Sequence, residues 1–156
     1  MITNLYLALG NYILSEEFAK ELEAQDLDSI KHVDWFKNQY KNEAKEIAYD
    51  LPAVFIEFGD SSATRDDYKI EEPIPLEFHL EQKDLGSTAM NSHNQAGSLN
   101  ELKLVDKLRD WLKKFEGIKH FSTLRYVGRR YDRNNKNAQV HILRFQCIFS
   151  KRRNCM

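Results

Sequence analysis

Two short apolar segments with a polar stretch between them place the strongest constraint on the fold of this 156-residue chain. Residues 52–58 (PAVFIEF) are apolar and β-branched and end at a Gly-Asp pair, as is typical of a strand and its turn. In residues 76–80 (LEFHL), apolar side chains alternate with polar ones, which predicts a strand with one buried and one solvated face. Consecutive strands usually pair, so we expect these two segments to form an antiparallel hairpin.

Two longer segments have the spacing of amphipathic helices. Residues 98–117 begin with the capping box formed by Ser98 and Glu101, and Gly117 is placed to end the helix. Residues 3–25 predict a second helix, with apolar side chains roughly three or four positions apart. The apolar stripe expected on the later helix consists of Leu102, Val105, Leu108, Trp111/Leu112 and Phe115.

The chain closes with two further expected strands, residues 122–131 and 139–149, joined by the turn-forming sequence DRNNKNA. Residues 32–36 could form a short strand, whereas residues 38–49 are polar and helix-prone. Grouped strands and separate helices predict the α+β class, with antiparallel sheets that carry the helices on one face as a sandwich. We expect one domain over residues 1–156, in which the basic tail 151–156 is flexible. The expected core is Val54, Ile56, Leu76, Phe78, Leu80, Leu102, Val105, Leu108, Leu112, Phe145 and Phe149.

Two polar stretches, residues 60–72 and 84–97, have no periodic pattern. Their few apolar groups cannot offset the entropy lost on ordering. We therefore expect both to be mobile in an isolated protomer and to become ordered only in an assembly.

Composition excludes several classes of protein. The chain is 42% hydrophobic with 9 Phe, 7 Tyr and 2 Trp at a net charge of −1, so it is not of the disordered class. No stretch approaches the roughly 18–20 apolar residues that a membrane span needs, and the N-terminal segment lacks the basic residues of a secretory leader. The only cysteines, Cys147 and Cys155, predict neither a structural disulfide nor a cysteine-based zinc site, which fits a reducing cytoplasm.

The near-neutral total conceals an uneven distribution of charge. Residues 1–116 carry 13 basic and 23 acidic side chains, a net charge of −10, whereas residues 117–156 carry 10 basic residues and a single acid, a net charge of +9. Such a split points to an acidic or polyanionic partner for the basic part, or to two halves that neutralise each other within one fold.

One alternative function is that of a metal-dependent nuclease. Asp60 ends one expected strand, and Glu81 and Lys83 have the acid-x-Lys spacing on the next, so the carboxylates could hold a divalent ion and the lysine could orient water. Against this hypothesis, Glu81 shares the expected solvated face, and such triplets arise by chance in a chain that is 30% charged. The five histidines have no metal-binding spacing, although His79 and His141 could lie close together on neighbouring strands.

The second alternative is a small nucleic-acid-binding module. Basic residues near the closing turn could bind phosphate, and the tyrosines between them could stack on bases. The same hairpin could also be a solvated edge, or could dock on an acidic protein surface. The residues concerned are Arg125, Tyr126, Arg129, Arg130, Tyr131, Arg133 and Lys136.

The order of elements as a whole resembles a known family. An N-terminal helix precedes the strands LPAVFIEFGD and PIPLEFHLEQ, and a Gly/Ser/Asn loop leads to the helix LNELKLVDKLRDWLKKFEG and a hairpin that ends in VHILRFQCIF. This order is similar to that of the tail-terminator and neck proteins, which serve head–tail joining and tail completion in long-tailed bacteriophages and prophages. The resemblance covers nearly the whole chain and consists of a pattern of elements, with no diagnostic catalytic residues.

The resemblance implies a protomer related to the tail-tube fold. Six copies would form a ring that caps the tail tube and docks the head connector, with DNA only as cargo in the lumen. It implies no catalytic, metal or cofactor site, no small-molecule substrate and no membrane, and assembly in the host bacterial cytoplasm into the virion. Together with the uneven charge distribution, the resemblance predicts that two groups of residues form a protein interface. The basic group is Arg129, Arg130, Arg133 and Lys136, and the acidic group is Asp60, Asp66 and Asp67.

Overall fold

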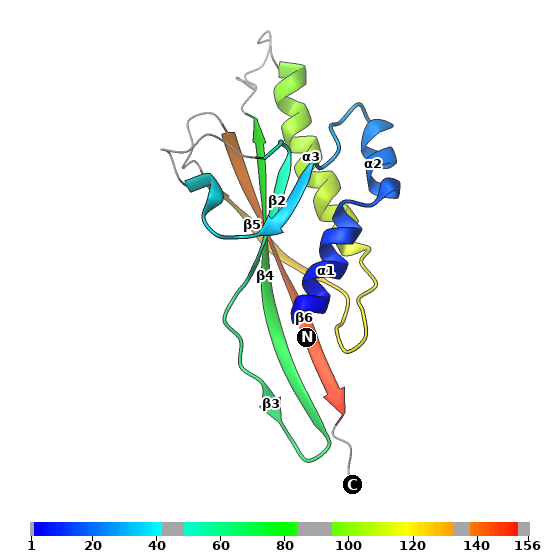
Figure 1. Ribbon diagram of the computed structural model, residues 1–156, viewed down its shortest axis with the longest axis vertical. Coiled ribbons are helices and arrows are strands. Elements are labelled where there is room, and N and C mark those ends of the chain that lie inside the picture. The colour runs from blue at the N-terminus through cyan, green and yellow to red at the C-terminus, as the bar shows by residue number, and fades with distance from the viewer. Residues whose placement is uncertain (1, 42–48, 84–94, 133–137, 153–156) are drawn as a thin grey trace.

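A computed structural model describes residues 2–41, 49–83, 95–132 and 138–152. In these residues three helices lie on one face of a six-stranded sheet (Figure 1). The elements in chain order are α1 (Ile2–Ile13), α2 (Glu16–Glu23), β1 (His32–Trp35), the 3-10 turn η1 (Gln39–Lys41), β2 (Ala53–Phe58), β3 (Thr64–Arg65), β4 (Lys69–Lys83), α3 (Gln95–Lys113), β5 (Arg125–Asp132) and β6 (Ala138–Arg152).

The sheet has the order β1-β2-β4-β6-β5, and β3 pairs with the outer edge of β4. The expected hairpin is confirmed, because β2 and β4 pair antiparallel with Val54 opposite Leu80 and Phe58 opposite Leu76. The α+β class and the helices on one face are confirmed as well. The expectation of several antiparallel sheets is wrong: the described strands form a single open sheet, and it is mixed because β1 runs parallel to β2.

The N-terminal helix is broken in two, where the sequence predicted one helix over residues 3–25. Ser15 caps α2, and its hydroxyl accepts a hydrogen bond from the Phe18 amide at 3.3 Å. The buried residues keep a spacing of four up to Ile13, and the next, Phe18, follows after five. That extra residue lets the chain turn while both helices keep their apolar sides on the core.

The first residue of helix α3 and the set of side chains that it buries also differ from the sequence prediction. It begins at Gln95, so Ser98 lies inside the helix and the capping box does not mark its start. Leu102 of the expected core is exposed, and Leu104 takes its place in the interior. The other ten expected core residues are buried. Trp111 ties α3 to the first two helices through stacked contacts with the rings of Tyr12 and Phe18, each at 4.8 Å.

The face of the sheet opposite the helices is covered as well, which the alternating pattern did not predict. His79 and Glu81 are buried in the structure, whereas the sequence placed both on a solvated face. Four described residues between β1 and β2 pack over this part of the sheet: Phe36, Tyr40, Tyr49 and Leu51. The ring of Tyr40 lies against that of Phe55. Strand β6 is accordingly buried on both sides at its N-terminal end.

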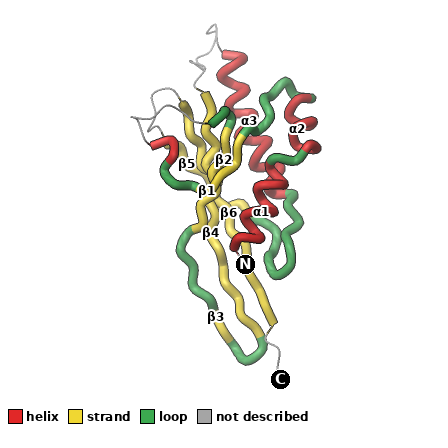
Figure 2. Tube along the Cα trace, viewed as in Figure 1, coloured by secondary structure: helices red, strands yellow, loops and turns green. Residues whose placement is uncertain are grey.

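Strands β4 and β6 pair without interruption over 15 residues each and extend well below the helices (Figures 1 and 2). We call the projecting part the arm: β3, residues 69–75 of β4 and residues 146–152 of β6. Residues 60–72, expected to have no regular structure, therefore contain β3 and the start of β4. Residues 84–94 lie outside the described part of the chain. No helix among the described residues is long and apolar enough to cross a membrane.

Candidate functional site

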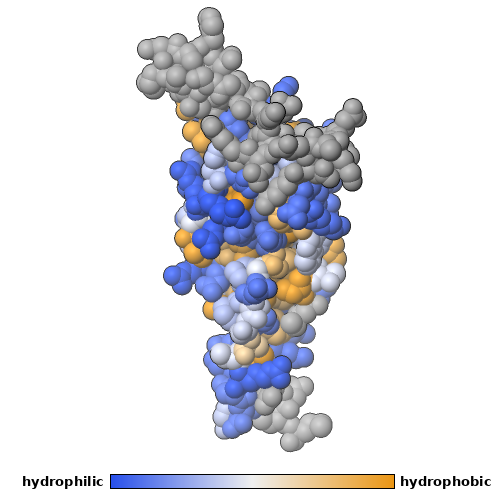
Figure 3. Space-filling view, turned by 90° about the vertical axis from the view of Figure 1, so that its left-hand side faces the viewer, coloured by the Kyte–Doolittle hydropathy of each residue, from blue (hydrophilic) through white to orange (hydrophobic). Residues whose placement is uncertain are grey.

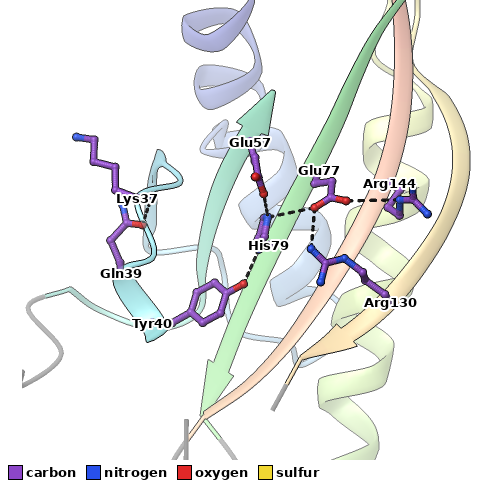
Figure 4. A network of polar contacts seen from close by, with 8 residues as sticks. All are labelled: Lys37, Gln39, Tyr40, Glu57, Glu77, His79, Arg130 and Arg144. Carbon is purple, nitrogen blue, oxygen red and sulfur yellow. Dashed lines mark hydrogen bonds and ion pairs between the residues drawn. The ribbon is translucent and has the colours of Figure 1, made fainter. Parts of the chain in front are cut away.

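A network of polar side chains crosses the helix-free face of the sheet at its centre (Figure 4). The imidazole of His79 lies between two partners: its Nδ1 is 2.6 Å from the Tyr40 hydroxyl, and its Nε2 is 2.7 Å from a carboxylate oxygen of Glu57. The ring of Phe36 stacks on the imidazole with centroids 4.0 Å apart. Both ring nitrogens of His79 are thus engaged, and the side chain is held in one orientation.

The network continues across the sheet through Glu77. One oxygen of this carboxylate is 3.0 Å from the Arg130 guanidinium, and the other is 3.5 Å from Arg144. The His79 Nε2 atom lies 3.6 Å from Glu77. Side chains from β2, β4, β5 and β6 therefore meet at one place, at the margin of an open groove of about 480 Å³ lined by Glu57, Gly59, Pro75, Leu76, Glu77, Val127, Arg130, Arg144, Phe145 and Gln146.

Burial and pairing set the protonation states in this network. Burial lowers the pKa of His79, although its hydrogen bond to Glu57 opposes the shift. Burial also raises the pKa of the Tyr40 hydroxyl, and the hydrogen bond to Glu77 raises that of Arg130. Near neutral pH the network therefore contains a neutral imidazole, a neutral phenol and a charged guanidinium.

Three of these side chains are also close enough to ligate one cation. A ligand atom from each of Glu57, Glu77 and His79 lies within 4.8 Å of the other two, and imidazole with carboxylates suits zinc or a similar metal. However, Arg130 and Arg144 already neutralise Glu77, and a dication would meet their positive charge. The arrangement is better suited to tying four strands together than to holding a metal.

The residues of the nuclease hypothesis are not brought together. Glu81 pairs with Ala53 at the start of β2, whereas Asp60 follows the end of that strand, about 20 Å away at the rise of an extended chain. Glu81 is fully buried, and the Tyr49 hydroxyl donates a hydrogen bond to it at 2.5 Å. Burial raises the pKa of Glu81, partly offset by this hydrogen bond. Asp60, Glu81 and Lys83 do not form one site.

The expected basic patch is divided between the two faces of the sheet. Arg130 pairs with Ile142 on the helix-free face, and Arg129 pairs with Leu143, whose side chain packs under the helices. Successive side chains of a strand point to opposite faces, so these two arginines cannot act as one surface. Arg133 and Lys136 lie outside the described residues.

The three acidic interface candidates are spread along the outer edge of the arm. Asp60 and Asp67 are exposed on either side of β3. Asp66 has a local role, because its carboxylate accepts hydrogen bonds from the amides of Tyr68 and Lys69 and so shapes the turn into β4. We call Asp60, Asp66 and Asp67 the acidic edge.

A basic hollow lies on the other edge of the arm, and sequence reasoning missed it. It has a volume of about 520 Å³ and is lined by Lys119, His120, Ser150, Lys151 and Arg152. The loop that carries the first two residues is fixed to β6, because the Ser150 amide donates to the His120 carbonyl at 2.8 Å and the Ser122 amide donates to the Ile148 carbonyl at 2.9 Å.

One glycine makes the turn into this loop possible. Gly117 has a φ of 85°, and a Cβ there would stand 2.6 Å from the Phe121 carbonyl oxygen. The sequence predicted Gly117 as the residue that ends a helix, but α3 ends at Lys113. The glycine instead shapes the loop that brings Lys119 to the basic tail of β6.

Signals for the polar network were present in the sequence but incomplete. The alternation in β4 placed Glu77, His79 and Glu81 on one face, as observed. Their burial depends on Tyr40 and Tyr49, which come from a segment without a regular pattern. His79 and His141 do not meet, because they sit on opposite faces: His79 faces Ile142 and His141 faces Leu80 in the paired strands.

Comparison with known proteins adds no family assignment. No family model matches the chain, and no curated protein matches it.

Proposed function

We propose that the protein is a structural subunit of a bacteriophage or prophage tail, which forms a ring that caps the tail tube and docks the head connector. The arm is the observation that carries the proposal. It is a continuous extension of the central sheet, formed by the uninterrupted pairing of β4 and β6, and it reaches beyond the helical layer that forms the body (Figure 2). A projecting strand pair of this kind gives a subunit a surface on which neighbouring subunits can dock.

Two further features support an assembly role. In chain order, α3 follows the strands β2 and β4 and precedes β5 and β6, and this order is the part of the resemblance to tail-terminator and neck proteins that supports the proposal. The polar network, the most organised group of titratable side chains among the described residues, is made of engaged partners and ties four strands together. Its roles here are stability and orientation of the arm.

The proposal is tested by removing the gene from the phage or prophage that encodes it. We expect intact heads and separate tails of uneven length in electron micrographs, and restoration of joined particles when the wild-type chain is supplied in trans. The alternative role of a metal-dependent nuclease would instead predict plasmid cleavage by the purified protein with Mg²⁺ or Mn²⁺. Normal, infectious particles from the deletion strain would overturn the proposal.

A further inference from the structure

The arm carries opposite charges on its two edges. The acidic edge follows β3, and the basic hollow lies beyond β6, so β4 and β6 separate them. Residues 60–67 contain three acids and one base, while Lys119, Lys151 and Arg152 line the hollow. Lys151 and Arg152 are successive residues at the end of β6, so their side chains leave the strand on opposite faces and the positive charge lies around the end of this edge. In Figure 3, which faces the side of the arm where β3 lies, hydrophilic side chains gather over the lower part of the molecule.

The described residues show no ion pair between the two edges within one protomer. Asp60 follows β2, and β4 and β6 separate it from the hollow, with adjacent strands about 4.8 Å apart. Asp67 lies in the turn between β3 and β4, nearer the hollow, and it makes no ion pair with a described residue. Some charge on the arm is paired locally, as between Lys69 and Glu71 at 2.8 Å. Asp60, Asp67, Lys119, Lys151 and Arg152 all remain exposed to solvent.

We propose that the acidic edge of one copy docks into the basic hollow of the next copy, so that the arms form the head-to-tail contact of a ring. This inference rests on the proposed function and names the surfaces that a subunit of such a ring would use. A contact between unlike surfaces is heterologous, and it closes into a ring when the rotation between copies divides a full turn. The opposite charges steer the copies into this orientation and penalise like-to-like encounters.

The hollow is better suited to a carboxylate-bearing protein edge than to extended nucleic acid. Its sides are formed by the loop at His120 and by β6, which backbone hydrogen bonds hold together. Tyr68, an exposed aromatic side chain among the described residues of the arm, lies in the turn between β3 and β4 and is not among the residues that line the hollow, whose only ring is the imidazole of His120. Single-stranded nucleic acid usually needs aromatic platforms beside the charge. The acidic edge of a neighbouring copy supplies a partner of opposite charge.

The test uses two variants of the full chain. We expect neither variant to assemble by itself, and we expect the two to assemble when mixed. Lys151→Glu with Arg152→Glu leaves both edges acidic, and Asp60→Lys with Asp67→Lys leaves both edges basic. Asp66 is kept because it shapes the turn. Matched controls carry the same charge changes on exposed sites of the body: Lys20→Glu with Lys103→Glu, and Glu17→Lys with Glu23→Lys.

Light scattering after size exclusion at physiological salt measures the assembly. We expect wild type and both controls to form the ring, each arm variant alone to dissociate at least tenfold more readily, and an equimolar mixture of the two arm variants to assemble again with alternating subunits. Circular dichroism establishes that each variant is folded; if a pair of substitutions prevents folding, the single variants Arg152→Glu and Asp67→Lys take its place. Rings that form equally well from the separate arm variants would overturn the inference.

Two other outcomes separate this inference from the proposed function. If wild type stays monomeric at all concentrations, the ring function itself fails together with the interface. If wild type forms rings that tolerate both arm variants, only the docking surface is wrong. A 20-base single strand and a 20-base-pair duplex serve as nucleic-acid probes: submicromolar binding by wild type that Lys151→Glu with Arg152→Glu abolishes, without loss of the ring, would make the hollow a nucleic-acid site and overturn the inference.

Discussion

Under the helices, the sheet presents side chains such as Val54, Leu76 and Leu143, while its opposite face places His79 and Glu81 beside Phe55. The first face is stabilised by burial of apolar surface, which tolerates small shifts in geometry. The second depends on hydrogen bonds that must be completed once the groups are removed from water. A mutation on the first face should therefore cost energy in proportion to the volume lost, and one on the second according to which partner is left unpaired.

The largest effect is expected on the helix-covered face. Leu108 is fully buried, so Leu108→Ala should lower the free energy of unfolding by about 2–5 kcal/mol and the melting temperature by several degrees. Thermal unfolding followed by circular dichroism measures the change. Leu102→Ala on the same helix is the control, because Leu102 is exposed and its truncation should be nearly neutral. Equal losses from the two substitutions would mean that α3 is not docked as described.

A smaller loss of stability is expected from removing one hydroxyl oxygen on the helix-free face of the sheet. Tyr40→Phe keeps the ring in place and leaves Nδ1 of His79 without its partner, which should cost about 1–3 kcal/mol. Tyr68→Phe, at an exposed tyrosine, serves as the matched control and should change nothing measurable in chemical denaturation. If Tyr40→Phe were equally silent, the network would not contribute to stability.

The third substitution should stabilise the protein. Because burial raises the pKa of Glu81, the folded state binds its proton more tightly than the unfolded chain, and stability declines as pH rises above the ordinary carboxyl range. Glu81→Gln removes the charge and should raise the melting temperature at pH 7 to 8. The gain should disappear at pH values below the ordinary carboxyl pKa, where wild type is also neutral. A variant less stable than wild type at pH 8 would show that the Tyr49 hydrogen bond to the carboxylate outweighs the cost of burial.

The smallest expected change in stability comes from a comparison of two neighbouring arginines on β5, Arg130 and Arg129. Arg130 pairs with Glu77, so Arg130→Ala should cost toward the upper end of the 0.2–1 kcal/mol found for exposed ion pairs. Arg129→Ala changes a side chain that points to the other face and should cost less. Urea denaturation of both variants at low and high salt measures the difference, which should shrink with salt because exposed charges are screened. A salt-independent difference would assign the Arg130 effect to packing of its aliphatic stem.

Sequence patterns were sufficient to predict those helices and strands in which the spacing of apolar residues matches the face that is buried in the fold. The pairing of β2 with β4 and the packing of α3 followed from such patterns. The start of β4 at Lys69 did not, because residues 60–72 have no periodic pattern and Pro73 and Pro75 are unusual inside a strand. The carbonyl of Pro75 accepts from the Gly59 amide, which shows that these residues turn their imino nitrogens toward the gap between β2 and β3. The missing donors fall where no continuous partner strand is present.

The candidate sites were predictable only in part, for two physical reasons. The burial of His79 and Glu81 is decided by side chains about 30 to 40 residues away in an irregular segment, which no local pattern reveals. The basic hollow combines a loop before β5 with the end of β6, which continues three residues beyond Phe149, where its apolar pattern stops. Charge counting identified the basic C-terminal region but not which of its cations share a surface.

For the ring assembly proposed above, the uninterrupted ladder of β4 and β6 has a kinetic consequence. Fifteen residues in extended conformation span about 50 Å, and every pair along that length is already in register. An arm that is folded before it meets its neighbour does not have to be ordered during docking. Subunit encounter then becomes a rigid-body search, in which the rate depends on diffusion, orientation and the attraction of charges rather than on a conformational step.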